Sequence, residues 1–96
     1  MFSWDAGKAL RNFQKHGVPF EEAATVFGDA AALELEDEEH SGPERRWFRL
    51  GFSIQGRLLL VIYTPRRLKN NVETIRIISA RQATRKERKI YAGFPA

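Results

Sequence analysis

Two helices are predicted in the N-terminal part of the chain, where apolar residues recur at helical spacing. The first follows Asp5, whose carboxylate can accept hydrogen bonds from the free N–H groups of a first helical turn, and it ends at Gly17. The second covers residues 20–27, where phenylalanine and alanine side chains form one apolar stripe that Gly28 ends. Both patterns are typical of helices that cover a sheet.

The pattern then changes to the two-residue period of strands. Residues 31–36 predict a first strand, and residues 45–54 alternate between an apolar face and an arginine-rich face. Residues 57–64 contain the apolar run 58–62, which predicts a central strand buried on both faces. A further strand is predicted over residues 74–80.

A last helix is predicted after the strands. Ser79 and Gln82 have the spacing of a capping box, so this helix should cover about residues 80–91. Residues 37–44 predict an acidic loop and residues 65–73 a basic one. This order of elements predicts an α+β fold, in which an antiparallel sheet of about four strands has two N-terminal helices and one C-terminal helix against it.

Length and composition exclude several classes of protein. Ninety-six residues suit a single domain that spans residues 1–96. The chain has no cysteine, so neither disulfides nor a thiolate metal site can stabilise it. We find no N-terminal targeting signal and no stretch of about 20 apolar residues. We therefore expect a cytoplasmic protein that does not contact a membrane.

The charges are divided unequally along the chain. The net charge is +4, but residues 1–44 hold 3 basic and 10 acidic side chains, whereas residues 45–96 hold 13 basic and 2 acidic ones. Most basic side chains in the second part are arginines, whose planar guanidinium groups suit phosphate. The basic part is therefore predicted to bind a polyanion such as a nucleic acid.

A series of short motifs runs along nearly the whole chain. They are Trp4-Asp5, Lys8-Ala9, Asn12, Lys15-His16-Gly17-Val18, Phe20-Glu21-Glu22-Ala23, Asp37, Glu39-His40-Ser41, Gly56-Arg57-Leu58, Tyr63-Thr64, Ile75-Arg76-Ile77-Ile78-Ser79-Ala80-Arg81, Glu87 and Tyr91. In content and order, these motifs closely resemble the BrnT family. One departure is the basic segment of residues 66–71, which is longer than the family pattern.

The resemblance implies a toxin of a type II toxin–antitoxin pair with a RelE-like fold, a ribonuclease that a BrnA antitoxin neutralises. It also implies that the complex binds operator DNA through the antitoxin. The chain itself has no evident DNA-reading helix-turn-helix. An exposed basic groove is easily masked by a partner that offers acidic side chains, which agrees with this expectation.

Cleavage of RNA without a metal has three requirements: a group that helps the 2′-hydroxyl attack the phosphate, cations that stabilise the charge on its oxygens, and a proton donor for the leaving 5′-oxygen. The sequence lacks the ligand spacing of a zinc or two-metal site and has no glycine-rich phosphate loop, so we predict neither metal nor cofactor. The catalytic candidates are Lys15, His16, Tyr63, Arg76 and Arg81.

Each candidate has a structural alternative. Arg76 stands among isoleucines, where it either pairs with a carboxylate or faces a concave site. Arg81, at the predicted start of the last helix, needs a nearby anion, either a phosphate or a carboxylate. Lys15 and His16 either act on RNA or favour the negative end of the first helix. Tyr63 either donates a proton to the leaving oxygen or packs within its strand.

Five arginines are predicted to follow the RNA backbone, with a solvated surface as the alternative reading. They are Arg45, Arg49, Arg57, Arg85 and Arg88. His40 lies beside the acidic residues 37–39, which repel RNA, so we expect it to serve its loop and to contact the antitoxin. Trp4 and Trp47 are expected in the core.

Three hypotheses follow. In the leading one, the chain is an endoribonuclease that cleaves single-stranded or ribosome-bound mRNA by transesterification, in a cationic groove formed by the sheet and the last helix. In the second, it is a non-catalytic nucleic-acid-binding or regulatory subunit. In the third, it is an interaction protein whose basic half docks an acidic partner. The first requires that Arg76 and Arg81 converge on one phosphodiester.

Overall fold

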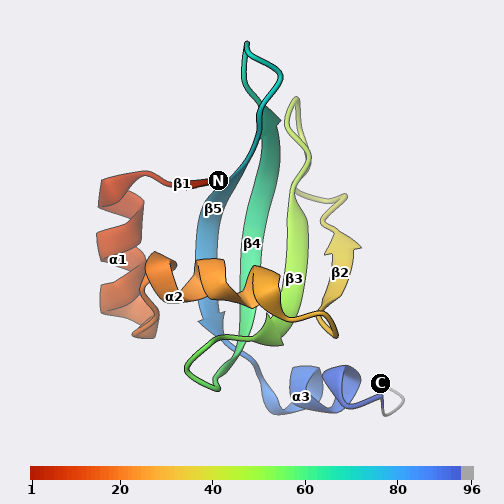
Figure 1. Cartoon of the computed structure of the whole chain (residues 1–96). Coiled ribbons are helices and arrows are strands. Elements are labelled where there is room, and N and C mark those ends of the chain that lie inside the picture. The colour runs from red at the N-terminus through yellow and green to blue at the C-terminus, as the bar shows by residue number, and fades with distance from the viewer. Residues whose placement is uncertain (94–96) are drawn as a thin grey trace.

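The computed structural model describes residues 1–93 and is built around one five-stranded sheet (Figure 1). From one edge to the other, the strands are β1 (Phe2–Ser3), β5 (Glu73–Gln82), β4 (Leu58–Arg67), β3 (Trp47–Phe52) and β2 (Leu33–Glu36). The strand with the longest apolar run, β4, lies at the centre, as predicted. The sheet is mixed, because β1 runs parallel to β5 while all other neighbours are antiparallel.

The α+β class is confirmed, and the sheet has one strand more than predicted. The additional strand, β1, has only two residues, too few for an alternating pattern to reveal it. The predicted N-terminal helices correspond to α1 (Ala6–His16) and to a second helix, α2 (Phe20–Thr25). The second is shorter than predicted, because it passes into a 3₁₀ turn, η1 (Val26–Gly28).

The helix α2 and the turn η1 lie across one face of the sheet, and α1 lies beside β5 (Figure 1). Asp5 caps α1 by accepting a hydrogen bond from the backbone N–H of Lys8 at 2.8 Å, and Gly17 ends it in the left-handed conformation, with φ of 70°. The fully buried core lies between the helical segments and the sheet. It consists of Val18, Phe20, Ala23, Val26, Leu59, Val61, Ile77 and Ala80.

The predicted start of the last helix is wrong. Residues 80–82 still belong to β5, where Gln82 pairs with Leu59, and the helix α3 covers Arg85–Tyr91. Its capping box is formed by Thr84 and Glu87, five residues beyond the predicted one. Long-range pairing with β4 therefore overrides the local capping signal at Ser79.

The predicted basic loop is also shorter than expected. The strand β4 continues to Arg67, and β5 begins at Glu73, so that only residues 68–72 form the connection. The backbone N–H of Leu68 donates to the carbonyl of Val72 at 2.8 Å, which closes a tight hairpin. This hairpin projects from one end of the sheet (Figure 1).

A bulge in β5 decides which side chains share a face of the sheet. Ser79 pairs with Ile62, but the next residue of β4, Tyr63, pairs with Ile77, which leaves Ile78 as an extra residue. Side chains five positions apart normally point to opposite faces of a strand. The extra residue reverses this relation after residue 78. As a result, Arg76 and Arg81 lie on the same face, the one opposite to α2 and η1, which we call the open face.

Candidate functional site

The arginine-rich side of β3 lies against the helical segments. Arg49 pairs with Val61 in the register, and it is on the face that α2 and η1 cover. Its guanidinium donates to the carbonyls of Val26 (3.2 Å) and Asp29 (3.0 Å), and it also binds Glu34. The side chain is only 16% exposed. Arg49 therefore fixes the 3₁₀ turn to the sheet and does not face an RNA groove.

The small residue Gly51 explains why the helical segments can approach this face. A Cβ atom at this position would lie 2.8 Å from the Cβ of Ala32 and 3.0 Å from a methyl group of Val26. Real Cβ atoms do not tolerate such contacts, so the close approach requires glycine. The arginine-rich face predicted for the strand is consequently the covered one.

Tyr63 lies on the same covered face. Its ring packs against Phe27 with 4.9 Å between the ring centroids, and its hydroxyl donates to Glu34 at 2.8 Å. Burial, followed by the neighbouring Glu34 carboxylate, raises the pKa of the tyrosine hydroxyl well above its ordinary value. The hydroxyl is thus held as a buried hydrogen-bond donor and is remote from the open face.

Arg57, which is partly exposed, forms an ion pair with the buried carboxylate of Glu22 in α2. The Arg57 guanidinium donates to both carboxylate oxygens of Glu22, and Ser53 donates to the same carboxylate at 2.7 Å. The Arg57 guanidinium holds the pKa of Glu22 below its usual range, despite the opposing effect of burial. Arg57 also donates to the carbonyl of Gly17 at 3.2 Å. These bonds connect the β3–β4 turn to the helices, so Arg57 has the contacts of a structural residue.

Arg76 lies in a cavity of about 320 Å³ on the open face. Arg76 of β5 pairs with Thr64 of β4. The preceding residue of β4, Tyr63, pairs with Trp47 of β3. Arg46, one residue before Trp47, therefore lies in the same row across the sheet as Thr64 and Arg76. The cavity is lined by Lys8, His40, Gly42, Pro43, Glu44, Arg46, Thr64, Arg66, Arg76 and Ile78, and we call it the basic pocket.

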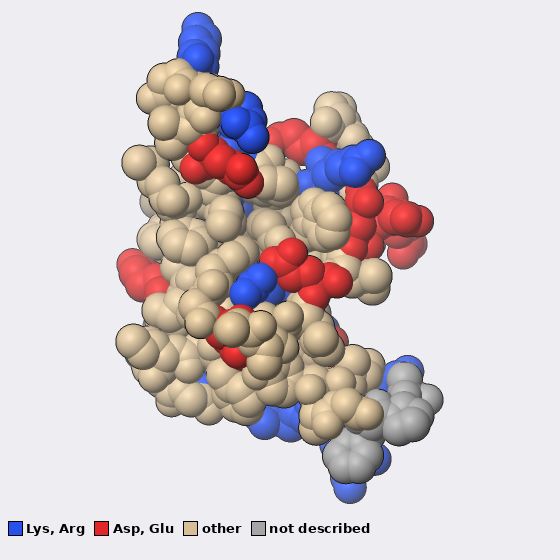
Figure 2. Space-filling model, turned by 45° about the vertical axis from the view of Figure 1, so that its right-hand side comes forward, with Lys and Arg blue, Asp and Glu red and all other residues tan. Residues whose placement is uncertain are grey.

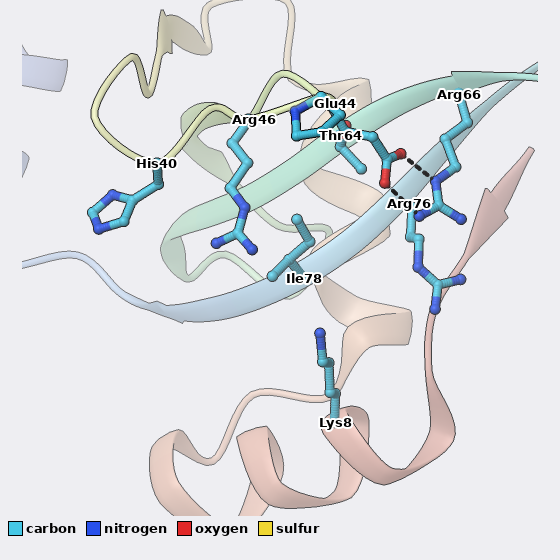
Figure 3. A pocket seen from close by; sticks show the side chains of 10 residues that line it. Lys8, His40, Glu44, Arg46, Thr64, Arg66, Arg76 and Ile78 are labelled. Carbon is cyan, nitrogen blue, oxygen red and sulfur yellow. Dashed lines mark hydrogen bonds and ion pairs between the residues drawn. The ribbon is translucent and has the colours of Figure 1, made fainter.

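The basic pocket contains four permanent cations and one carboxylate. Glu44 binds Arg66 through two hydrogen bonds of 2.6 and 2.8 Å, and this contact lowers the pKa of Glu44, with smaller contributions from Arg76 and Arg46. Within residues 1–93, no carboxylate pairs with Lys8, Arg46 or Arg76. The pocket therefore has an excess of positive charge. Figure 3 shows Lys8 pointing from α1 toward Ile78, with Arg46 and Arg76 on either side.

His40 lies at one side of this pocket, beside Arg46 (Figure 3). Its Nδ1 atom is 3.0 and 3.1 Å from the two carboxylate oxygens of Asp37, a buried residue. The backbone N–H of His40 also donates to Asp37, at 3.3 Å. This pairing orients the imidazole through Nδ1, and Nε2 is the ring nitrogen that does not contact Asp37. The His40 side chain remains 61% exposed.

His40 serves its loop, as predicted, through its contacts with Asp37, and it also lines the basic pocket, which sequence reasoning did not predict. In the structure, Asp37 is turned inward against the imidazole, whereas Glu38 and Glu39 are exposed. The spacing of Asp37 and His40, three residues apart in a turn, is a signal that could have identified the pair. The contributions of Arg46 and Lys8 required the register of the sheet and the position of α1.

The other predicted catalytic residues lie outside the basic pocket. Lys15 and His16 line a neighbouring pocket at the end of α1. Arg81 is bound by Glu87 through hydrogen bonds of 2.8 and 2.9 Å, and it borders a mainly apolar hollow over β2, β3 and β4. The five candidates therefore do not meet at one point, and the predicted convergence of Arg76 and Arg81 on one phosphodiester is wrong: the two side chains line different pockets. The anion that Arg81 requires is supplied by a carboxylate.

The remaining predicted RNA contacts are dispersed. Arg45 is exposed and lies 3.5 Å from Glu36, while Arg85 and Arg88 are exposed on α3. Figure 2 shows acidic and basic side chains side by side on the face in view, without a broad basic surface. Among the pockets described, the basic pocket holds four lysine and arginine side chains.

Residues 1–93 hold neither a cluster of metal ligands nor a helix that could span a membrane. This part of the chain contains no group of three or more histidine, cysteine, aspartate or glutamate residues arranged to hold a metal ion. It also contains no helix with the length and apolar character needed to cross a membrane.

Comparison with known proteins identifies the family. A search of curated proteins gives no match. The family model described as "Ribonuclease toxin, BrnT, of type II toxin-antitoxin system" matches residues 4–87, which include every residue that lines the basic pocket. The chain therefore belongs to the BrnT family of ribonuclease toxins of type II toxin–antitoxin systems.

Proposed function

We propose that this protein is a metal-independent endoribonuclease that cleaves mRNA, free or on the ribosome, and thereby arrests growth. The observation that carries the proposal is the basic pocket, where Lys8, Arg46 and Arg76 have no carboxylate partner within residues 1–93. Such side chains are available to a phosphodiester. The membership of a ribonuclease toxin family agrees with RNA as the source of that group.

Arg46 and Arg76 would hold the scissile phosphate, because guanidinium groups bind its oxygens through two parallel hydrogen bonds. Lys8 approaches from α1 and adds a third positive charge. Cations that are already in place when charge develops on the phosphate oxygens stabilise the transition state without further reorganisation.

In the reaction, the 2′-oxygen forms a bond to phosphorus while the bond from phosphorus to the 5′-oxygen breaks. One proton passes overall from the 2′-hydroxyl to the 5′-oxygen, and the products are a 2′,3′-cyclic phosphate and a 5′-hydroxyl. His40 is suited to carry this proton, since an imidazole can accept a proton and donate it again, and Asp37 orients its ring. Lys15, His16, Tyr63 and Arg81 have no part in this step.

The toxin would be neutralised by a BrnA-like antitoxin in the cytoplasm. An antitoxin that places acidic side chains in the basic pocket would compete directly with RNA for Arg46 and Arg76. Operator DNA would be contacted through the antitoxin alone.

The proposal is tested with purified protein, end-labelled single-stranded RNA and EDTA. We expect cleavage in EDTA, with 2′,3′-cyclic phosphate ends, and a decrease of about 100-fold or more in rate for His40→Ala. The matched control is Glu39→Ala, which alters an exposed neighbour in the same loop and should cleave at the wild-type rate. RNA binding without any products would contradict the proposal and would favour a non-catalytic binding subunit. Loss of cleavage on addition of EDTA would contradict metal independence.

A further inference from the structure

The pocket at the end of α1 adjoins the basic pocket. It has a volume of about 220 Å³ and is lined by Lys8, Arg11, Asn12, Lys15, His16, Ile78 and Ser79. Lys8 and Ile78 line both cavities, so the two pockets share a wall. No carboxylate lines this second pocket. The positive surface therefore continues from the basic pocket along α1.

The spacing of the cations along α1 places them on one side of the helix. Lys8, Arg11 and Lys15 are separated by three and four residues, the spacing of neighbours on a helix surface. From Lys8 to Lys15, the helix rises by roughly 10 Å, at 1.5 Å per residue. All three side chains are exposed, and none has an ion-pair partner within the described part of the chain.

Asn12 fixes this side of α1 against β5. Its side-chain amide donates to the carbonyls of Val18 (3.0 Å) and Ala80 (2.8 Å), and its oxygen accepts from the backbone N–H of Ala80 at 3.1 Å. Asn12 is buried, and these bonds satisfy it fully with backbone groups. Its role is therefore to hold the cations of α1 in a constant position relative to Arg76 on the same strand as Ala80.

We propose that the pocket at the end of α1 is a second phosphate subsite, which binds a backbone phosphate flanking the scissile one on the same RNA strand. This inference rests on the proposed function and assigns Arg11, Lys15 and His16 to substrate binding instead of the chemical step. Lys8 lies between the two phosphates. The substrate is thus a single strand that extends beyond the two nucleotides joined by the cleaved bond.

The nature of the lining favours a nucleic-acid backbone over an apolar protein segment. Apart from Ile78, the side chains around this pocket are polar or cationic, and it is shallow and open. A chain of phosphates at regular spacing matches cations repeated along a helix, and such contacts position the strand without reading its bases.

The test compares cleavage of a dinucleotide with cleavage of an RNA of eight nucleotides. For Arg11→Ala and Lys15→Ala, we expect KM for the longer RNA to rise about three- to tenfold, while kcat stays within about twofold and dinucleotide cleavage is unchanged. The salt dependence of binding should also become weaker, by roughly 0.7 in the slope of log K against log salt for each lost contact. Lys15→Arg, which keeps the charge, should retain most of the affinity.

The control is Lys86→Ala, which removes an exposed lysine of α3 that lines neither pocket. An equal loss of affinity in this variant would overturn the proposal, since it would show a general effect of net charge. Equal losses on the dinucleotide and the longer RNA would also overturn it.

Binding of an uncleavable 2′-deoxy analogue of the same length separates this proposal from the proposed function. If no RNA is cleaved but Arg11→Ala and Lys15→Ala still weaken binding of the analogue, the result supports the phosphate subsite and contradicts the nuclease assignment. If RNA is cleaved and these variants bind the analogue as the wild type does, the subsite fails alone. Weaker binding of an acidic peptide but not of the analogue would assign the pocket to the antitoxin instead.

Discussion

Two arginines bound to the covered face of the sheet differ in their partners from two arginines on the open face. On the covered face, Arg49 and Arg57 are bound to carboxylates and to backbone carbonyls of the helical segments. On the open face, Arg46 and Arg76 share a cavity with Lys8 and have no carboxylate partner within residues 1–93. The same residue type thus stabilises the fold on one face and remains available to a ligand on the other.

This difference follows from what each face meets. Helical segments bring carboxylates and unpaired carbonyls close to the covered face, and a guanidinium there must be paired, because an unpaired buried charge is costly. The open face meets solvent, so an arginine there can stay hydrated without a carboxylate partner. Arg81 shows that the face alone does not determine whether an arginine is paired, because Arg81 lies on the open face and is nevertheless bound to Glu87.

The largest effect is expected from Arg76→Ala. If Arg76 stabilises charge on the scissile phosphate, kcat/KM for RNA should fall by about 100- to 1000-fold, while the melting temperature changes little. Single-turnover cleavage and thermal unfolding measure the two effects. A fall in stability without a specific loss of cleavage would place Arg76 with the structural arginines and remove the contrast between the faces.

Arg57→Ala should have the opposite signature. It leaves the buried carboxylate of Glu22 without its cation, so we expect the free energy of unfolding to fall by about 3 kcal/mol. Cleavage by the folded fraction should persist. Urea denaturation measures the loss, and adding Glu22→Gln to Arg57→Ala should recover part of it. An unchanged urea midpoint in Arg57→Ala would show that the pair does not stabilise the fold.

The Arg57–Glu22 pair predicts that the free energy of unfolding depends on pH. Because Arg57 lowers the pKa of Glu22 below its ordinary value of 4.5, the stabilisation is complete above that value and is lost as the pH falls through the lower folded-state pKa. The difference in stability between wild type and Arg57→Ala should therefore shrink as the pH falls from about 5 to about 3. Urea midpoints over this range test it, and a constant difference would contradict it.

A smaller effect is expected from Arg81→Ala. Removing the hydrogen bonds to Glu87 should cost about 1 kcal/mol of stability, since the pair is partly exposed. Cleavage should stay within about threefold of wild type, in contrast to Arg76→Ala on the same strand and face. A loss of cleavage as large as that of Arg76→Ala would restore Arg81 as a catalytic residue.

The smallest effect is expected on α3. Arg85 and Arg88 are exposed and border neither the basic pocket nor the pocket at the end of α1. Replacing each with alanine should change RNA affinity by about twofold or less at physiological salt, because solvated surface charges are screened. Fluorescence anisotropy with labelled RNA measures this. A tenfold loss would extend the RNA-binding surface to the last helix.

Much of the fold could be predicted from local pattern. The cap at Asp5 and the end of α1 at Gly17 are confirmed, because each depends on residues close together in the chain. The central position of β4 is confirmed too, because its continuous apolar run is typical of a strand that is buried on both faces. The strand β1 and the end of β5 could not be predicted in this way. Both depend on hydrogen bonds between distant segments, such as the bond from Ile75 to Met1.

The sequence by itself determined that the chain combines helices with a β-rich, basic second half, and its motifs identified the family. Only the tertiary structure decided which basic residues are available to a ligand. The bulge at Ile78 places Arg76 and Arg81 on one face, and the register of β3, β4 and β5 brings Arg46 into the same pocket as Arg76. The physical reason is that the role of a charge depends on its partners, and in a fold those partners come from segments that are far apart in sequence.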